Sequence, residues 1–388
     1  MRIAFVTDSP YYLDRRAQRS VSVLLELGNQ VTVLDQGINP ELSAGAIPVS
    51  ADLHSSPIPR SRTRRLLWSL RNRIAPLMAH RGRTLWCFDQ LEQIKPDLIH
   101  VVNPFSLEAV TDFCAEYDVP FIYEAYEYWS EHLSSHEYGL ANRLASYLRD
   151  VEFQAIQKSD YVISVSPLIC NWYQELGAKK VICIYNTPDY NIWNNSTSEC
   201  MQRAAELPPQ LQLVHSGNLA HNRRVDILIK AVAKVQNSSL LILGSGPEEK
   251  HLKKLVNFLS IEERVFFQPP VTSAELISRL KDFDIGLITH FPDSKQLDGA
   301  LPNKLFDYLA AGLGIVAFRT KALGSLEDVE SFAILLDEAS EIALAEALQS
   351  LSNDPERVSQ MKRVACYVMH RYSSEQAREK LAEIYRSF

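Results

Sequence analysis

The stretch Met1-Arg2-Ile3-Ala4-Phe5-Val6-Thr7-Asp8 contains an almost wholly apolar run from Ile3 to Thr7. Such a run is typical of a strand that is buried on both faces of a parallel sheet. Helical periodicity follows over residues 13–27, with Gly28 as a C-terminal stop, and Val31-Thr32-Val33-Leu34 is the next strand. This order of strand, helix and strand predicts an α/β fold.

The same alternation continues along the chain and restarts after a polar segment. Helical patterns separate further strands, and residues 319–388 are expected to be mostly helical. Residues 186–209 are polar and end in Pro208-Pro209, so we interpret them as an interdomain linker. The sequence therefore predicts two doubly wound α/β domains of similar size that face a central cleft. The further strands are expected at residues 97–102, 120–125, 161–165, 181–185, 211–215, 240–243, 265–267, 285–289 and 315–318.

Composition excludes several classes of protein. The 388 residues are 46% hydrophobic and 22% charged, and the net charge of −7 excludes a globally basic nucleic-acid-binding protein. No run approaches about 18 apolar residues, and the first apolar stretch is too short for a signal peptide, so we expect a cytoplasmic protein. No two cysteines form a CxxC pair, so we expect thiols in a reducing compartment at Cys87, Cys114, Cys170, Cys183, Cys200 and Cys366.

Glycine-rich turns give a weak signal for phosphate binding. No glycine follows the first strand, which argues against a dinucleotide-binding dehydrogenase. Gly244-Ser245-Gly246-Pro247 does follow a predicted strand and precede a predicted helix. The backbone there can approach a phosphate or sugar at the helix N-terminus, or it can simply form a tight turn, and both interpretations stay open.

Three segments of the second half together resemble the family 4 glycosyltransferases of the GT-B fold. The most specific is Ala300-Leu301-Pro302-Asn303-Lys304-Leu305-Phe306-Asp307-Tyr308-Leu309-Ala310-Ala311-Gly312, which is similar to the donor-binding helix of that family. The other two are residues 215–229, with His215-Ser216-Gly217-Asn218-Leu219, and residues 265–287. A weaker likeness covers residues 95–100, 162–166 and 185–188 of the first half.

The resemblance implies a function for each of two Rossmann-like domains. Residues 1–187 would bind the acceptor, residues 188–370 would bind a nucleotide sugar, and a helix at about residues 371–388 would pack back on the first domain. The implied reaction moves a hexose-like sugar to a hydroxyl of a glycan, a lipid-linked sugar or a small molecule. It would proceed with retention of configuration and without a metal or other cofactor.

The chemistry of a departing diphosphate explains the residue types in the second half. Arg223 precedes one helix and Lys304 lies in the first turn of another, so both can meet the negative charge, together with the N–H groups of the helix N-terminus. Asp307 lies one turn beyond Asn303, and the resemblance implies that it binds ribose hydroxyls. The competing interpretation is a solvated helix face. The implied donor-binding residues are Gly217, Asn218, Arg223, Gly244, His290, Pro302, Asn303, Lys304, Leu305 and Asp307.

Two positions depart from the family pattern. Gly299 stands where the family often has a glutamate that binds sugar hydroxyls, with Asp293 and Asp298 as the nearby carboxylates. Tyr126 stands where a histidine is expected, beside Glu127, and these two are the implied catalytic residues. Either Glu127 or the leaving phosphate would deprotonate the acceptor hydroxyl. The departures leave two alternatives open, a nucleotide-sugar epimerase on the same fold and a non-catalytic sugar- or nucleotide-binding relative.

Two charged segments need separate interpretation. Asp282-Phe283-Asp284 resembles the DxD triplet of metal-dependent enzymes, but it joins a predicted helix to a strand without further carboxylates nearby, so no metal site is expected. Residues 60–83 form a basic amphipathic stretch without acidic residues. It can lie on the anionic inner face of a membrane, as in a peripheral protein, or pack as an ordinary helix with a charged outer face. Its arginines are Arg60, Arg62, Arg64, Arg65, Arg71, Arg73, Arg81 and Arg83.

Overall fold

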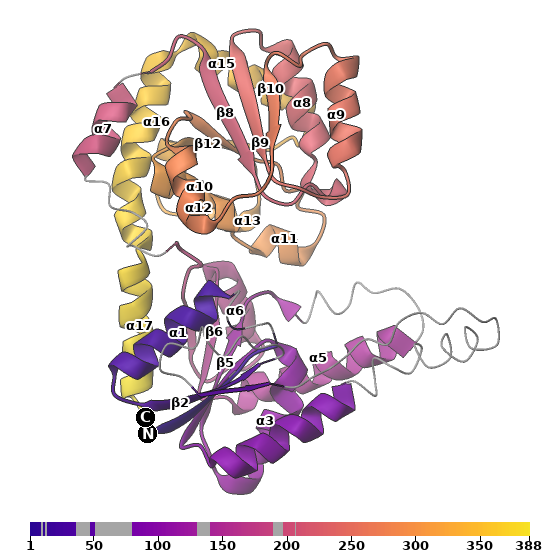
Figure 1. Ribbon diagram of the computed structural model, residues 1–388, viewed down its shortest axis with the longest axis vertical. Coiled ribbons are helices and arrows are strands. Elements are labelled where there is room, and N and C mark those ends of the chain that lie inside the picture. Colours follow the sequence, from indigo (N-terminus) through magenta and orange to yellow (C-terminus); the bar gives the residue numbers. More distant parts are fainter. Residues whose placement is uncertain are drawn as a thin grey trace, which may run out of the picture. The chain divides into compact units, whose positions relative to one another are not determined.

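The computed structural model describes residues 1–8, 11, 14–35, 47–50, 80–129, 140–188, 197–205 and 207–388. The chain forms two compact units (Figure 1). Unit 1 comprises Met1–Tyr185 together with Arg378–Phe388, and unit 2 comprises Asn186–Ala377. Each unit is built on one parallel sheet with helices between its strands, so the predicted pair of doubly wound α/β domains is confirmed.

The sheet of unit 1 has seven parallel strands in the order β3-β2-β1-β4-β5-β6-β7. Every residue of β4 and β5, and all but the first residue of β1, is buried, which requires cover on both faces of the sheet. Because both faces of these strands are buried, successive side chains are apolar, which explains the continuous apolar runs in the sequence. The strands are β1 (Arg2–Val6), β2 (Gln30–Asp35), β3 (Ile47–Ser50), β4 (Leu98–Val102), β5 (Phe121–Ala125), β6 (Tyr161–Ser164) and β7 (Val181–Cys183).

The helices of unit 1 begin and end at residues that suit those positions. Helix α1 (Arg15–Glu26) begins at Asp14, whose carboxylate accepts hydrogen bonds from the N–H groups of Arg16 and Ala17. The chain leaves α1 through Gly28, whose φ of +77° lies in the left-handed region. The other helical segments are residues 80–94, η3 (Pro104–Ser106), α3 (Leu107–Tyr117), α5 (Leu140–Lys158) and α6 (Pro167–Glu175).

Arg378–Phe388, most of which lie in the last helix α17 (Ser374–Arg386), belong to unit 1, and α17 lies alongside α1 (Figure 1). The buried Tyr385 hydroxyl lies 2.8 Å from Nδ1 of His100, and Nε2 of His100 lies 3.0 Å from the Glu124 carboxylate. Lys380 donates a hydrogen bond of 3.1 Å to the carbonyl of Cys183. The end of the chain is therefore tied to unit 1 by buried polar contacts as well as by apolar packing.

The sheet of unit 2 has six parallel strands in the order β10-β9-β8-β11-β12-β13. They are β8 (Leu211–Ser216), β9 (Ser238–Leu243), β10 (Val265–Gln268), β11 (Ile285–Ile288), β12 (Gly314–Phe318) and β13 (Ala333–Leu336). Helices link them: η6 (His221–Arg223), α8 (Val225–Lys234), α9 (Glu249–Phe258), α10 (Ser273–Leu280), α11 (Lys295–Gly299), α12 (Asn303–Ala311), α13 (Lys321–Gly324) and α14 (Val329–Phe332). After β13 follow α15 (Glu341–Asn353), α16 (Pro355–Val368) and η7 (Met369–Tyr372).

Two strands and one helix are the main elements that the sequence prediction misses. Strand β3 lies at the edge of its sheet and contains Pro48, a residue that counts against a strand except at an edge. Strand β13 is a four-residue edge strand in the region expected to be helical. Helix α7 (Thr197–Ala205) lies within the segment interpreted as a linker, so that segment is not wholly irregular.

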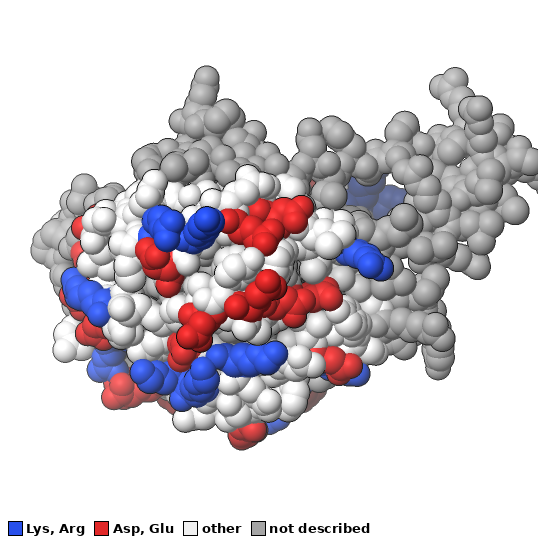
Figure 2. Space-filling model, turned by 90° about the horizontal axis from the view of Figure 1, so that it is seen from below, with Lys and Arg blue, Asp and Glu red and all other residues white. Residues whose placement is uncertain are grey.

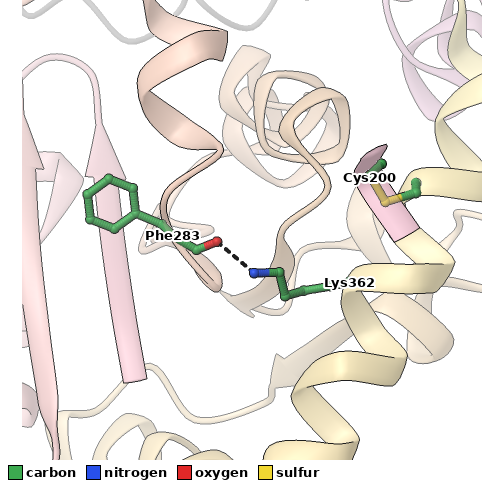
Figure 3. Close-up of a disulfide and its surroundings, with 4 residues drawn as sticks. Cys200, Phe283 and Lys362 are labelled. Carbon is green, nitrogen blue, oxygen red and sulfur yellow. Dashed lines mark hydrogen bonds between the residues drawn. A yellow bond between two sulfur atoms is a disulfide. The ribbon is translucent and has the colours of Figure 1, made fainter. Parts of the chain in front are cut away.

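A disulfide between Cys200 of α7 and Cys366 of α16 contradicts the expectation of free thiols at all six cysteines (Figure 3). The two Cα atoms are 6.1 Å apart, and 166 residues separate the partners in sequence. Cys87, Cys114, Cys170 and Cys183 remain thiols. Sequence spacing could not reveal the pair, because only the packing of α7 on α16 brings the two residues together.

Charged side chains mix on the face of the molecule shown in Figure 2, where acidic groups gather between basic ones. The predicted basic stretch lies outside the described residues except for its end. There, Arg81 is exposed and Arg83 lies 3.3 Å from the Asp8 carboxylate. Among the described helices, none combines the length and the apolar character needed to cross a membrane.

Candidate functional site

The predicted donor-binding residues of unit 2 meet where β8 ends and α12 begins. Gly217 follows β8 with a φ of +126°, and Nζ of Lys304 lies 3.5 Å from the point that a Cβ would occupy there. Gly244 follows β9, and a Cβ on it would overlap the carbonyl oxygen of Gly217. Both turns therefore require glycine, and together they leave a surface of bare backbone beside Lys304.

Lys304 is a half-buried cation among polar groups. Burial, with the like charge of Arg223, lowers the pKa of Lys304 to about 7, although Asp307 partly offsets this. Its Nζ lies 3.4 Å from Nε2 of the fully buried His215. Nδ1 of His215 lies 3.2 Å from the carbonyl of Leu287, which can only accept, so Nδ1 donates and Nε2 is left to accept from Lys304.

His290 follows β11 and has an unsatisfied buried atom. Its Nδ1 is inaccessible to solvent and has no hydrogen-bond partner among the described residues. Burial and the nearby charges of Lys304 and Arg223 lower the pKa of His290 to about 2, so the ring is neutral. An unpaired buried polar atom costs about 1–3 kcal/mol, which a ligand atom would recover.

A hydrogen bond at its backbone carbonyl anchors Arg223 to the residue that precedes His290. Its carbonyl accepts a hydrogen bond of 2.7 Å from Oγ1 of Thr289, which precedes His290. The next residue, Arg224, adopts a φ of +51° and directs its guanidinium toward Asp226 and the ring of Phe291. Two cations and two neutral imidazoles thus gather around bare backbone, an arrangement that suits a ligand carrying negative charge.

Helix α12 supplies the remaining donor-binding residues. Pro302 precedes the helix, and the side chain of Asn303 accepts a hydrogen bond of 2.8 Å from Asn186. Asp307 is only 9% exposed, and Leu305 is fully buried, with its side chain in the core. The hydroxyl of Tyr308 accepts a hydrogen bond of 2.9 Å from the N–H of Ser216 and so ties α12 to the end of β8.

Asn218 and the carboxylates near Gly299 have neighbours of their own. Oδ1 of Asn218 lies 2.7 Å from the point that a Cβ would occupy at Gly246, so this pair of turns also packs closely. Asp298 accepts a hydrogen bond of 2.7 Å from the N–H of Lys321 and pairs with its ammonium at 2.7 Å. Asp298 thus holds the start of α13, while Asp293 is exposed.

The implied catalytic residues, Tyr126 and Glu127, follow β5 and belong to unit 1, whereas the donor-binding residues belong to unit 2. The guanidinium carbon of Arg16 lies 3.3 Å from the centre of the Tyr126 ring, which is 7% exposed. Burial raises the pKa of Tyr126 well above its usual value. The carbonyl of Glu127 accepts hydrogen bonds from the N–H of Trp129 at 3.0 Å and from the Tyr173 hydroxyl at 3.1 Å.

Sequence reasoning missed His215, Tyr308 and Arg16. His215 and Tyr308 both lie inside the donor-binding motifs, but nothing in the local sequence indicates their partners, Leu287 and Ser216, which lie far away in the chain. Arg16 lies far along the chain from Tyr126, and only the fold brings the start of α1 close to the residue that follows β5.

Within the Asp282-Phe283-Asp284 triplet, Asp284 forms a structural ion pair with Lys362. Asp284 accepts from Nζ of Lys362 at 2.8 Å and from the N–H of Gln212 at 3.0 Å, and both charged side chains are buried. Lys362 also donates to the carbonyl of Phe283 at 3.1 Å (Figure 3). Across the described part of the chain, no group of three or more His, Cys, Asp or Glu side chains could hold a metal ion.

Known proteins resemble both halves of the chain. The LpsD lipopolysaccharide core biosynthesis glycosyltransferase of Rhizobium meliloti (strain 1021) is 31% identical over 128 residues, which are 33% of this chain and 35% of that protein. The N-acetyl-alpha-D-glucosaminyl L-malate synthase of Bacillus anthracis is 24% identical over 238 residues, 60% of this chain and 57% of that protein. The chain thus aligns with less than two thirds of the length of these curated relatives.

The structure of Anabaena HepE in complex with UDP has a TM-score of 0.72 and 16% identity, covering 100% of both chains. At this identity the likeness shows the fold. The family model for Glycosyltransferase Family 4 matches residues 15–191, and that for Glycosyl transferases group 1 matches residues 210–354. With both halves matched in succession on a shared two-domain fold, the chain belongs to the group 1, family 4-like glycosyltransferases of the GT-B fold.

Proposed function

We propose that the protein transfers a sugar from a nucleotide-activated donor to an acceptor hydroxyl during the assembly of a glycan or glycoconjugate. The observation that carries this proposal is the cluster of Arg223 and Lys304 beside Nδ1 of His290, which has no hydrogen-bond partner in the described part of the chain. These groups would bind the diphosphate, whose charge grows as the sugar departs. The named activities of the relatives, including lipopolysaccharide core biosynthesis, support the same class of reaction.

The proposed reaction breaks the bond between the anomeric carbon and the donor phosphate oxygen, and the diphosphate leaves with the electron pair. The acceptor oxygen forms the new bond to the anomeric carbon. Its proton passes to the leaving phosphate or to Glu127. A much slower transfer in Glu127→Gln would indicate the route through Glu127, and an unchanged rate would indicate the route through the phosphate. We propose retention of configuration and independence of metal, so transfer should persist in excess EDTA. Complete loss of transfer in EDTA, with recovery on addition of Mn²⁺, would contradict the proposed independence of metal.

Calorimetry with UDP tests the proposed donor site, and UDP is the first choice because HepE binds it. Lys304→Ala and Arg223→Ala should each lose a charge-assisted contact of about 1.5–3 kcal/mol, which weakens binding by about tenfold or more. Lys250→Ala, at an exposed lysine on α9, is the matched control and should bind normally. Unchanged affinity for UDP, GDP, ADP and dTDP in both site variants would remove the assignment.

Product analysis separates the two alternative functions. Release of an isomerised sugar without acceptor would indicate an epimerase, and tight nucleotide binding without hydrolysis or transfer would indicate a non-catalytic relative. The acceptor can be a glycan, a lipid-linked sugar or a small molecule.

We also propose that the protein lies in the cytoplasm and meets an anionic inner membrane face through residues 60–83. Changing Arg64, Arg65, Arg71 and Arg73 to Gln should then abolish sedimentation with phosphatidylglycerol vesicles and leave UDP binding intact. Vesicle binding that is indifferent to these arginines would favour the packed-helix interpretation.

A further inference from the structure

Arg16 and Tyr126 form a stacked pair at the end of β5 in unit 1. The guanidinium carbon lies 3.3 Å from the ring centre, which places the planar cation on the ring face. The Tyr126 ring is 7% exposed, so it provides a fixed surface, while the Arg16 side chain is 23% exposed. The arginine is therefore immobilised on one face and still accessible from solvent.

The start of α1 fixes the same arginine through its backbone. Asp14 accepts a hydrogen bond of 3.0 Å from the N–H of Arg16 and holds the first turn. The same carboxylate oxygen lies 3.6 Å from Nε of Arg16, which is an ion pair beyond hydrogen-bond distance. Backbone, stacked ring and nearby carboxylate thus all restrict the guanidinium before any ligand arrives.

The outer edge of this guanidinium is available for binding. In the part of the chain that the structure describes, neither Nη1 nor Nη2 of Arg16 donates a hydrogen bond. A planar fork of N–H donors matches the two oxygens of a carboxylate or phosphate, and restricting it beforehand lowers the entropy cost of binding. The pair therefore has the geometry of an oxyanion-binding group.

We propose that Arg16 binds an oxyanion of the acceptor, a phosphate or a carboxylate, and that Tyr126 is a positioning residue that holds Arg16 in place. The assignment of the anion to the acceptor rests on the proposed function, in which unit 1 binds the acceptor. Tyr126, at the position expected to hold a histidine, thus acts through its ring face rather than as an acid or base.

Modification of arginine side chains by phenylglyoxal tests the oxyanion site without any assay of transfer. The full-length protein is modified and then digested, and mass spectrometry measures the rate of modification at each arginine. Inorganic phosphate should slow the modification of Arg16 by about tenfold, because a bidentate contact occupies the edge that the reagent needs. Arg15, the exposed neighbour in the same turn of α1, is the matched control and should react at an unchanged rate. Equal protection of both arginines, or of neither, overturns the proposal.

Two substitutions test the role of the ring. Tyr126→Phe keeps the ring face and should keep the protection of Arg16, whereas Tyr126→Leu should abolish it while circular dichroism confirms folding. Loss of protection in Tyr126→Phe would overturn the positioning role, and this variant keeps the core packing should Tyr126→Leu fail to fold.

The source of the anion follows from which probe protects Arg16. Glycerol phosphate should protect and UDP should not, since we assign the anion to the acceptor; protection by UDP alone overturns that assignment. In transfer assays, Arg16→Lys should raise the KM for an anionic acceptor with little change in kcat. Protection by phosphate in a protein without transfer activity would defeat the proposed function and leave the anion site standing. Normal transfer kinetics in Arg16→Ala, without protection in the wild type, would defeat the site alone.

Discussion

At the scale of single residues, Lys304 should make donor binding depend on pH. Its pKa in the free protein is about 7, and a bound diphosphate favours the charged ammonium, so binding raises this pKa. Binding then takes up a proton above pH 7, and UDP affinity should fall as pH rises from 7 to 9, by at most about tenfold per unit. Calorimetry in buffers of different ionisation enthalpy measures the proton uptake directly.

Lys304→Arg is the control for this dependence. Arginine stays charged throughout the range, so its affinity for UDP should be nearly level between pH 7 and 9. An equal fall of affinity in wild type and Lys304→Arg would place the titrating group elsewhere.

The residue types of the donor site could be predicted from the sequence, and their environments could not. Lys304 and Arg223 were expected to meet an anion because of their places before or within a helix turn. The neutral state of His290, the tautomer of His215 and the contact of Tyr308 with Ser216 depend on atoms from separate strands. The side chain of Leu305 is buried in the core although the residue lies inside the donor-binding motif, and the sequence pattern did not show this.

At the scale of secondary structure, Gly312 ends α12 under two constraints. Its φ of +75° suits glycine, and an added Cβ would meet Sγ of Cys200 too closely and Sγ of Cys366 at 2.9 Å. Gly312→Ala should therefore lose about 1 kcal/mol for the backbone and a further 1–3 kcal/mol for overpacking. Urea unfolding measures the loss.

Gly28 provides the matched control for Gly312. Its φ is +77°, yet an added Cβ there would have no atom within 4 Å, so Gly28→Ala should lose only about 1 kcal/mol. Equal losses in the two variants would mean that the disulfide does not crowd the end of α12.

Most strands were predictable from their apolar runs, whereas two edge strands, β3 and β13, were not. The eleven predicted strands lie where hydrophobic runs meet turn residues, and in the structure a capping box of Thr272 and Glu275 marks the start of α10. Strand β3 contains Pro48, which counts against a strand, and β13 lies in the region expected to be helical. Tertiary pairing at a sheet edge, rather than local sequence, makes them strands.

At the scale of the whole molecule, the disulfide should stabilise unit 2. Closing a loop of 166 residues restricts the unfolded chain and contributes on the order of 5 kcal/mol. Cys200→Ser, or reduction of the wild type, should lower the melting temperature of unit 2 by roughly 10 °C. Calorimetry checks this, with Cys114→Ser as a control that removes a thiol outside the bond. Six alkylated cysteines in the unfolded, unreduced protein would show that the bond is absent.

The course of the chain has a mechanical consequence. The chain leaves unit 1 after Tyr185 and returns at Arg378, so both termini belong to unit 1 and unit 2 is an insertion within it. Optical tweezers that pull on the two ends should load unit 1 first, and tension reaches unit 2 only after residues 378–388 detach. The bond between Cys200 and Cys366 then prevents the loop of 166 residues that it closes from being stretched. At about 3.5 Å per residue, the fully stretched chain should lengthen by roughly 580 Å when a reductant is added.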